Sequence, residues 1–236
     1  MGKRLVQQAR GRGGPTYRAP SFRYVGEAKY NEMRDGTAKV VDVVHCSGHT
    51  TPLARMEYNN GETGVVIAAD NLRVGTEIAM GSNAAVENGN VLPLESIPEG
   101  TLIFNIEGVP GDGGKFVRCS GTFAKVLSKL KGGVIVQLPS KKKKTFNPLC
   151  RASIGACAGG GRVDKPFVKA GNHYYWMKAR NKLWPLVKGV ARNAIDHPFG
   201  GSSSRHKGRP TTAPKNASPG RNVGLIHARR TGRKKR

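Results

Sequence analysis

Asp196 and His197 are adjacent in the segment RNAIDHPFGGSSSRHKGRP, which spans residues 192–210. A carboxylate beside an imidazole is the pair from which a general base and its orienting group are made. A catalytic histidine also needs a pocket with groups that polarise the reacting bond. The sequence near this pair offers no activated serine, cysteine nucleophile, paired acid or Walker-type loop. An enzyme with His197 as its base is therefore kept only as the catalytic alternative.

The residues that follow His197 predict a stiff loop. Pro198 fixes its own φ and keeps His197 out of helical geometry. Gly200 and Gly201 allow backbone conformations that are closed to other residues, and they let a ligand approach the main chain. We expect this loop to contact RNA through its shape, with Asp196 fixing the ring orientation and tautomer of His197.

The composition indicates which ligand such a loop meets. The chain has 236 residues with 40 Lys and Arg against 15 Asp and Glu, a formal net charge of +25. Such an excess repels itself unless a polyanion neutralises it, so nucleic acid or an anionic membrane surface is indicated, with a general basic tail as the alternative. The sequence holds no apolar run long enough to span a bilayer and no apolar stretch typical of a signal peptide, so we expect no membrane partner.

Most of the excess charge lies in the two flanks of the chain. Residues 1–34 carry 8 basic and 2 acidic side chains, residues 165–236 carry 18 and 1, and residues 35–164 carry 14 and 12. The flanks are also rich in Gly, Pro, Ser and Asn, so they bury too little apolar surface to offset the entropy of ordering them. They are predicted to be extensions that order only on a partner; ordinary disordered tails are the alternative.

The middle of the chain predicts β-structure. Alternating and β-branched residues indicate strands within residues 37–45, 53–69, 100–108, 114–127 and 129–147. Asn60-Gly61 is a strong hairpin signal, Gly132-Gly133 marks a second turn, and Lys141–Lys144 forms a basic hairpin tip. Short strands between turn residues predict small barrels, which leave few open sheet edges.

A cluster of Asn, Gly and Pro at residues 83–100 marks a seam between two such barrels. Residues 35–110 carry 3 basic and 10 acidic side chains, whereas residues 111–164 carry 11 and 2, so the second barrel and the flanks should make most contacts with phosphate. The predicted order is a basic N-terminal extension (1–34), a first barrel (35–90), a second barrel (91–164) and a basic C-terminal extension (165–236). The last extension holds a short helix within residues 168–182 and the His197 loop.

Basic and aromatic residues interleave in the predicted helix. Cations neutralise phosphates and flat rings stack on unpaired bases, so this pattern suits RNA. The rings are His173, Tyr174, Tyr175 and Trp176. A helix that packs these rings on the barrel is the alternative, and we expect Trp176 to be partly buried.

The four cysteines, Cys46, Cys119, Cys150 and Cys157, form no C-x-x-C pair. A disulfide framework is not expected in a chain of this size without a secretory signal, so we predict reduced, structural thiols. His45, Cys46 and His49 have the residue types of a zinc site, but the alternation before them favours a strand end. No metal or cofactor is expected, apart from RNA-bound Mg²⁺ that could lie nearby.

Three segments carry a family resemblance: residues 189–201, residues 220–236 and residues 30–45. They resemble the universal large-subunit ribosomal protein family that is second in the large-subunit series, and the similarity runs over essentially the whole chain. The length and the HPFGG block resemble the archaeal and eukaryotic branch. The bacterial form usually has His-Pro-His followed by three glycines, so Phe199 and Ser202 depart from it.

The resemblance implies an oligonucleotide-binding-type barrel, then an SH3-like barrel, with extensions that thread into rRNA. It further implies a structural role near the peptidyl-transferase centre, in subunit assembly, in the bridge to the small subunit and in the architecture of the tRNA sites. Its partners would be large-subunit rRNA and neighbouring ribosomal proteins, within the cytoplasmic ribosome. His197 matches the histidine of the family that has long been debated as a participant in peptide-bond formation. A DNA-compacting protein is the binding alternative.

The candidate rRNA-binding residues follow from these segments. They are Lys141, Lys142, Lys143, Lys144, Lys178, Arg180, Lys182, Arg192, Asn193, Asp196, His197, Gly200, Gly201, Arg205, His206, Lys207, Arg209, Arg221, Arg229, Arg230 and Arg233. No catalytic or metal-binding residue is assigned.

Overall fold

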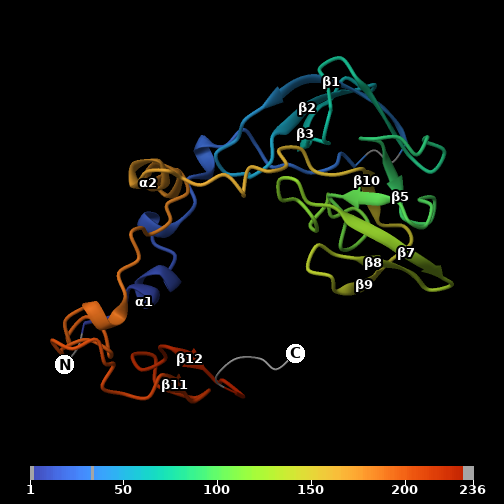
Figure 1. Ribbon diagram of the computed structural model, residues 1–236. Helices are drawn as coiled ribbons and strands as arrows, with labels where there is room; N and C mark the ends of the chain where they lie inside the picture. The colour runs from blue at the N-terminus through green and yellow to red at the C-terminus, as the bar shows by residue number, and fades with distance from the viewer. Residues whose placement is uncertain (1–2, 33–34, 231–236) are drawn as a thin grey trace. The chain divides into compact units, whose positions relative to one another are not determined.

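The computed structural model describes residues 3–32 and 35–230, and these form two compact units (Figure 1). Residues 21–170 make up the first, here called the barrel unit. Residues 1–20 and 171–236 contribute the second, here called the terminal unit. The fold is mostly β, as the sequence predicts.

Ten short strands build the barrel unit. They are β1 (Gly36–Val44), β2 (Leu53–Tyr58), β3 (Thr63–Ile67), β4 (Glu77–Met80), β5 (Val91–Pro93), β6 (Leu102–Phe104), β7 (Ala124–Leu130), β8 (Gly133–Gln137), β9 (Lys143–Phe146) and β10 (Arg151–Ile154). Their hydrogen-bonded order is β3-β2-β1-β4-β5-β10-β6-β7-β8-β9. All neighbouring pairs are antiparallel except β4 and β5.

The hairpins predicted from turn residues are confirmed. Strands β2 and β3 join through Asn60-Gly61, where Gly61 has a φ of +79° that favours glycine. Strands β7 and β8 join through the turn residues Lys131 and Gly132, one residue earlier than the predicted Gly132-Gly133 turn, and Gly133 begins β8 opposite Leu130. Strands β8 and β9 join through a loop that ends at the predicted basic tip. A register shift between Val40 and Asp42 interrupts the pairing of β1 with β2, and the alternation of buried residues in β1 ends there.

Two apolar clusters fill most of the barrel unit. One gathers Val40, Met56, Ile78 and others from β1 to β5, and a second gathers residues such as Ile103 and Val126 from β5 to β10. Strand β10 pairs with both β5 and β6, so the end of this unit returns to link the two halves. The assignment of one barrel to residues 35–90 and another to residues 91–164 stays a prediction.

Residues 28–31 are fastened to the barrel unit rather than to the rest of the N-terminal flank. The N–H of Lys29 donates to the carbonyl of Val65 at 3.0 Å, and the N–H of Tyr30 donates to the carbonyl of Gly113 at 3.1 Å. Ala28 and Tyr30 are buried. The flank predicted as residues 1–34 is therefore divided between the two units, because its second half docks on the barrel unit while residues 1–20 belong to the terminal unit.

The terminal unit combines both flanks of the chain. It contains the helix α1 (Val6–Gly11), most of the helix α2 (Ala170–Lys178) and the 3₁₀ turns η1 (Pro15–Tyr17) and η3 (Gly189–Ala191). Its two short strands, β11 (Thr212–Ala213) and β12 (Leu225–Ile226), pair in parallel. A third 3₁₀ turn, η2 (Ser21–Arg23), belongs to the barrel unit. The composition predicts flanks that order only on a partner, whereas Leu5, Phe199 and Val223 here form a small buried cluster. Since these residues come from both flanks, neither flank alone would have revealed the cluster.

Helix α2 is shorter than the predicted range of residues 168–182. It ends at Lys178, and the N–H of Lys182 donates to the carbonyl of Met177 at 3.0 Å as the chain turns away. Asn181 has a φ of +49°, which is incompatible with a continuing helix. In the portion of the chain that the structure describes, no helix has the length and apolarity needed to cross a bilayer.

Candidate nucleic-acid interface

The loop that contains His197 is held by its own backbone. The N–H of His197 donates to the carbonyl of Asn193 at 3.1 Å, and the N–H of Gly201 donates to the carbonyl of Arg192 at 3.3 Å. The N–H of Phe199 donates to Nδ1 of His197 at 3.0 Å. The neutral ring therefore carries its proton on Nε2. The rings of His197 and Phe199 lie 5.3 Å apart, and both side chains are buried.

Glycines make this tight arrangement possible. A methyl group on Gly189 would overlap the imidazole of His197, and a methyl group on Gly200 would overlap the carbonyl oxygens of Arg192 and Asn193. The absent side chain of Gly200 thus makes room for the loop's own backbone, which is a different reason from the approach of a ligand expected from the sequence. Gly201 has a φ of +100°, in the region that favours glycine.

The expectation that Asp196 orients His197 is wrong. The carboxylate of Asp196 lies 3.7 Å from Nζ of Lys3, and the two side chains are 41% and 68% exposed, respectively. The acceptor role of Nδ1 is fixed by Phe199 instead. An Asp-His pair adjacent in sequence does not place its two side chains together, because Pro198 and the turn at Asn193 set their directions.

The pKa of His197 is lowered from its ordinary value of 6.5, first by burial and then by the positive charge of Arg192. Both causes disfavour the protonated ring. The neutral form is also the one that can accept the hydrogen bond from Phe199. His197 is therefore a neutral structural acceptor near pH 7, and its Nδ1 is already occupied by a backbone donor.

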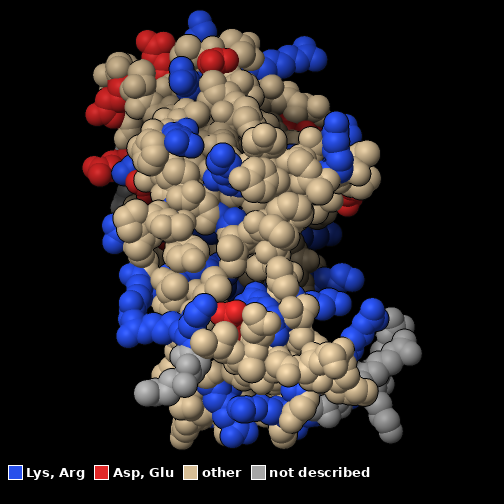
Figure 2. Space-filling view, turned by 90° about the vertical axis from the view of Figure 1, so that its left-hand side faces the viewer, with Lys and Arg blue, Asp and Glu red and all other residues tan. Residues whose placement is uncertain are grey.

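Positive charge dominates the terminal unit. Residues 1–20 and 171–236 hold 21 Lys and Arg and a single acidic residue, Asp196, whereas residues 21–170 hold 19 and 14. Figure 2 shows many Lys and Arg side chains on the surface, with fewer Asp and Glu on the same face. The candidates Lys178, Lys182, Arg205, His206, Lys207, Arg209, Arg221, Arg229 and Arg230 are all exposed. Arg233 lies outside the described residues.

Five of the candidate residues line one basic hollow in the terminal unit. This hollow has a volume of about 750 Å³, and the candidates at its wall are Arg192, Asn193, Gly201, Arg205 and Lys207. Its lining also includes Lys188 and Ser202–Ser204, which are not among the predicted rRNA-binding residues. These residues could have been predicted from the sequence, because basic and hydroxyl side chains close to the His197 loop are suited to bind phosphate. Such side chains are typical donors to phosphate.

Several candidate cations also lie over aromatic rings. Arg180 lies 4.4 Å from the ring centre of Trp176, and Lys207 lies 5.3 Å from that of Phe199. Trp176 is half-buried, as expected. In the barrel unit Lys141–Lys144 are exposed, and Nζ of Lys144 lies 3.8 Å from the ring centre of Phe116. That contact anchors one lysine of the hairpin tip to the body of the same unit.

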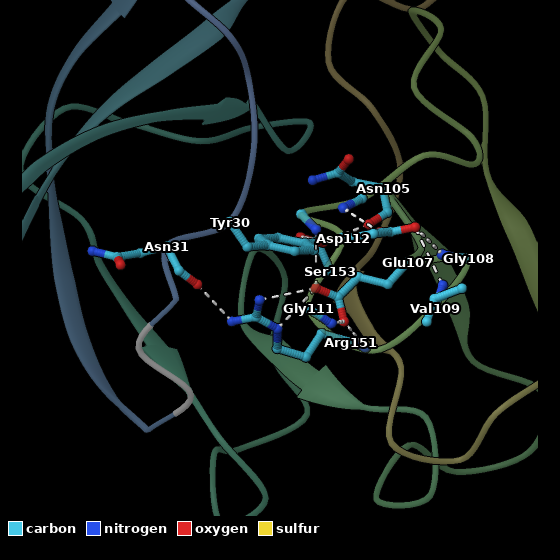
Figure 3. A network of polar contacts seen from close by, with 12 residues as sticks. Tyr30, Asn31, Asn105, Glu107, Gly108, Val109, Gly111, Asp112, Arg151 and Ser153 are labelled. Atoms are coloured by element: carbon cyan, nitrogen blue, oxygen red, sulfur yellow. Dashed lines mark hydrogen bonds and ion pairs between the residues drawn. The ribbon is translucent and has the colours of Figure 1, made fainter.

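A buried polar network in the barrel unit was not foreseen from the sequence (Figure 3). Nη2 of Arg151 lies 2.9 Å from Oε1 of Glu107, whose side chain is fully buried. Glu107 also accepts hydrogen bonds from the backbone N–H of Gly111, Gly113 and Arg151. The hydroxyl of Tyr30 donates to the carbonyl of Asn105 at 2.8 Å. This network joins the N-terminal segment, the loop after β6 and strand β10, so it stabilises the barrel unit rather than forming a ligand site.

The cysteines are free thiols, as predicted. Burial is the main cause that raises the pKa of Cys150 to about 11 and that of Cys157 to about 12, so both resist forming the reactive thiolate. Nδ1 of His49 lies 3.2 Å from the sulfur of Cys46, but no three His, Cys, Asp or Glu side chains in residues 3–32 and 35–230 are placed to hold a metal ion. The zinc alternative at His45, Cys46 and His49 thus finds no support.

A strand-rich barrel unit and a strongly basic terminal unit in one chain are typical of a β-protein that binds nucleic acid. Comparison with known proteins narrows this class. Residues 87–217 match the family of Ribosomal Proteins L2, C-terminal domain. The chain is 51% identical over 234 residues to large ribosomal subunit protein uL2 of Archaeoglobus fulgidus, an alignment that covers 98% of this chain and 99% of the relative. It is 49% identical to the protein of the same name from Methanothermobacter thermautotrophicus, with both chains fully covered.

The chain therefore belongs to the large ribosomal subunit protein uL2 family, in its archaeal type. This membership confirms the resemblance seen in the sequence. It also confirms that the protein is not an enzyme, since the relatives bear the name of a ribosomal protein. The same finding favours a ribosomal protein over the DNA-compacting alternative.

Proposed function

We propose that this protein binds large-subunit rRNA near the peptidyl-transferase centre and holds it in shape. The observation that carries this proposal is the charge of the terminal unit, with 21 basic residues against one acidic residue. Neutralising phosphates with Lys and Arg releases counterions, which supplies much of the affinity of such proteins for nucleic acid. The rigid His197 loop gives this charge a fixed shape.

The candidate rRNA-binding residues act in two ways in this proposal. The exposed cations contact phosphates, including Lys141–Lys143 on the barrel unit and Arg205, Arg209 and Arg221 on the terminal unit. The hollow beside the His197 loop receives a phosphate-sugar segment between Lys188 and Arg205. Phosphate contacts position a protein and carry little sequence information, so the rRNA is recognised mainly by its fold.

The protein supports subunit assembly and the architecture of the tRNA sites, contacts neighbouring ribosomal proteins, and contributes to an intersubunit bridge. Its expected location is the cytoplasmic ribosome. His197 supports the loop and takes no part in peptide transfer.

A crosslinking map tests this proposal. Protein–RNA crosslinks are induced in purified ribosomal particles that contain the tagged full-length chain, and the linked nucleotides are sequenced. We expect the tagged protein to sediment with large subunits and its terminal unit to link to rRNA around the peptidyl-transferase centre. Sedimentation apart from large subunits, or links confined to distant rRNA, would overturn the proposal.

A further inference from the structure

A second hollow in the terminal unit has a different character from the basic one. It has a volume of about 250 Å³, and Tyr17, Tyr174 and Trp184 line it together with Lys178 and Lys182. Three aromatic side chains from three separate segments thus meet at one small hollow. The volume is just below the range of about 300 to 1,000 Å³ typical of pockets for drug-sized ligands, so it suits one flat ring system.

The walls of this hollow are held in place by both flanks of the chain. The side-chain amide of Asn181 donates to the carbonyl of Arg18 at 2.8 Å, which ties the turn after α2 to the N-terminal segment. Tyr17 belongs to η1, whose last N–H donates to the carbonyl of Gly14 at 3.0 Å. On the other wall the ring of Trp184 lies 4.8 Å from that of His173. Contacts from both flanks therefore position this aromatic lining.

The positive charge around this hollow indicates which kind of aromatic ligand it can bind. Lys178 and Lys182 are exposed, and Nζ of Lys178 lies 5.9 Å from the ring centre of Tyr174. The terminal unit around them holds a single acidic residue. A flat ring attached to an anionic chain satisfies both features, whereas a basic peptide would be repelled. Aromatic rings beside lysines are how proteins hold unpaired bases of single-stranded RNA.

We propose that this hollow, defined by Tyr17, Tyr174 and Trp184, binds one unpaired nucleotide of RNA. The base stacks on the aromatic wall and its flanking phosphates meet Lys178 and Lys182. The inference rests on the proposed rRNA binding and adds to it a site for a base that has left its helix.

Tryptophan fluorescence tests this inference in the full-length chain. The sequence has two tryptophans, so Trp176→Phe leaves Trp184 as the sole reporter. Titration with a short oligouridylate should quench Trp184, while inorganic polyphosphate, which carries the charge without bases, should leave it bright. In the same background Tyr174→Leu should weaken oligouridylate binding about 5- to 150-fold, the loss expected for one stacked base.

Tyr175→Leu is the matched control. Tyr175 lies next to Tyr174 on α2 and is exposed, but it does not line the hollow. We expect its oligouridylate affinity to stay within about twofold of the parent protein. Unchanged Trp184 emission in the free variants verifies that the hollow is intact.

The outcomes separate this inference from the proposed function. Equal quenching by polyphosphate, or equal losses of oligouridylate affinity for the two tyrosine variants, would overturn the nucleotide site. If rRNA still binds tightly in those cases, the proposed function stands. Loss of all rRNA binding by the parent protein would instead overturn both.

Discussion

The backbone N–H of Phe199 donates a hydrogen bond of 3.0 Å to Nδ1 of His197, and the two rings lie 5.3 Å apart. The imidazole of His197 therefore stabilises the turn of its own loop by accepting a backbone hydrogen bond. A histidine used as a general base needs a free nitrogen directed at the substrate. Here one nitrogen is committed to a backbone donor and the side chain is buried, so the geometry favours a structural role.

His197→Ala should impair incorporation of the protein without slowing chemistry. The substitution leaves the buried N–H of Phe199 without its acceptor, at a cost of about 1 to 3 kcal/mol. His197→Asn, which keeps a side-chain acceptor, should restore much of the loss. The measurement is the fraction of large subunits that hold each variant.

The rate of peptide transfer distinguishes a structural role of His197 from a role as general base, provided that every large subunit contains the variant protein. With the Ala variant completely incorporated, single-turnover transfer to a fast acceptor should proceed at nearly the normal rate and with the same pH dependence. A general base would contribute roughly 10²- to 10⁴-fold. A hundredfold loss with intact RNA structure would contradict the structural role.

The His197 loop should loosen in mild acid. Burial and then Arg192 lower the pKa of His197 below 6.5, so the folded loop binds a proton less readily than the unfolded chain. Stability is therefore complete above pH 6.5 and is lost as the pH falls through 6.5 towards the folded pKa. The protection factor of the Phe199 amide against hydrogen exchange should fall over this range. The Asn variant should lose this response; an identical pH profile would show that another group is responsible.

Glu107→Gln should destabilise the barrel unit severely. The variant keeps the shape of the side chain but leaves the guanidinium of Arg151 without its buried counterion, which typically costs about 3 to 5 kcal/mol. Asp196→Asn is the control, because its ion pair with Lys3 is exposed and should contribute only about 0 to 1 kcal/mol. Denaturant unfolding of the full chain, followed by its β-sheet circular dichroism, gives both values. Similar losses for the two variants would refute the special role of the buried pair.

Exposed arginines of the terminal unit should set the salt dependence of rRNA binding. Deletion of residues 205–236, which hold 11 of the 40 basic residues, should flatten the slope of log affinity against log salt. The deletion also removes Val223 from the apolar cluster, so Arg205, Arg209 and Arg221 changed together to Gln give a cleaner test. Each lost phosphate contact should reduce the slope by about 0.7 to 0.9.

The matched control for that test replaces Lys39, Arg55 and Arg73 with Gln. These three are also exposed but belong to the acidic stretch of residues 35–110. They should leave the slope unchanged. An equal effect of both triple variants would mean that total charge, and not the terminal unit, governs binding.

Limited trypsin digestion should release a fragment that begins after Arg18 or Arg23 and ends near Lys165 or Lys169. All four residues are exposed, whereas Ala28 and Tyr30 are buried against the barrel unit. Mass spectrometry of the surviving fragment identifies its ends. A stable fragment that starts at Asp35 would show that residues 28–31 do not dock.

Local features of this protein could be predicted from the sequence because they depend on neighbouring residues. The Asn60-Gly61 hairpin follows from the backbone preferences of those two residues, and the excess of Lys and Arg in the flanks is a property of composition. The HPFGG block and its surroundings were enough to indicate the family. None of these inferences required knowing the path of the chain.

Only the tertiary structure decided which distant residues meet. The N–H of Lys3 donates to the carbonyl of Ile195 at 2.8 Å, Glu107 pairs with Arg151, and Tyr17 shares a hollow with Trp184. The sequence also suggested the wrong partner for His197, since adjacent residues in a turn point their side chains in different directions. Whether two residues far apart in the sequence meet depends on the length and direction of every strand and turn between them. A short sequence pattern does not contain that information.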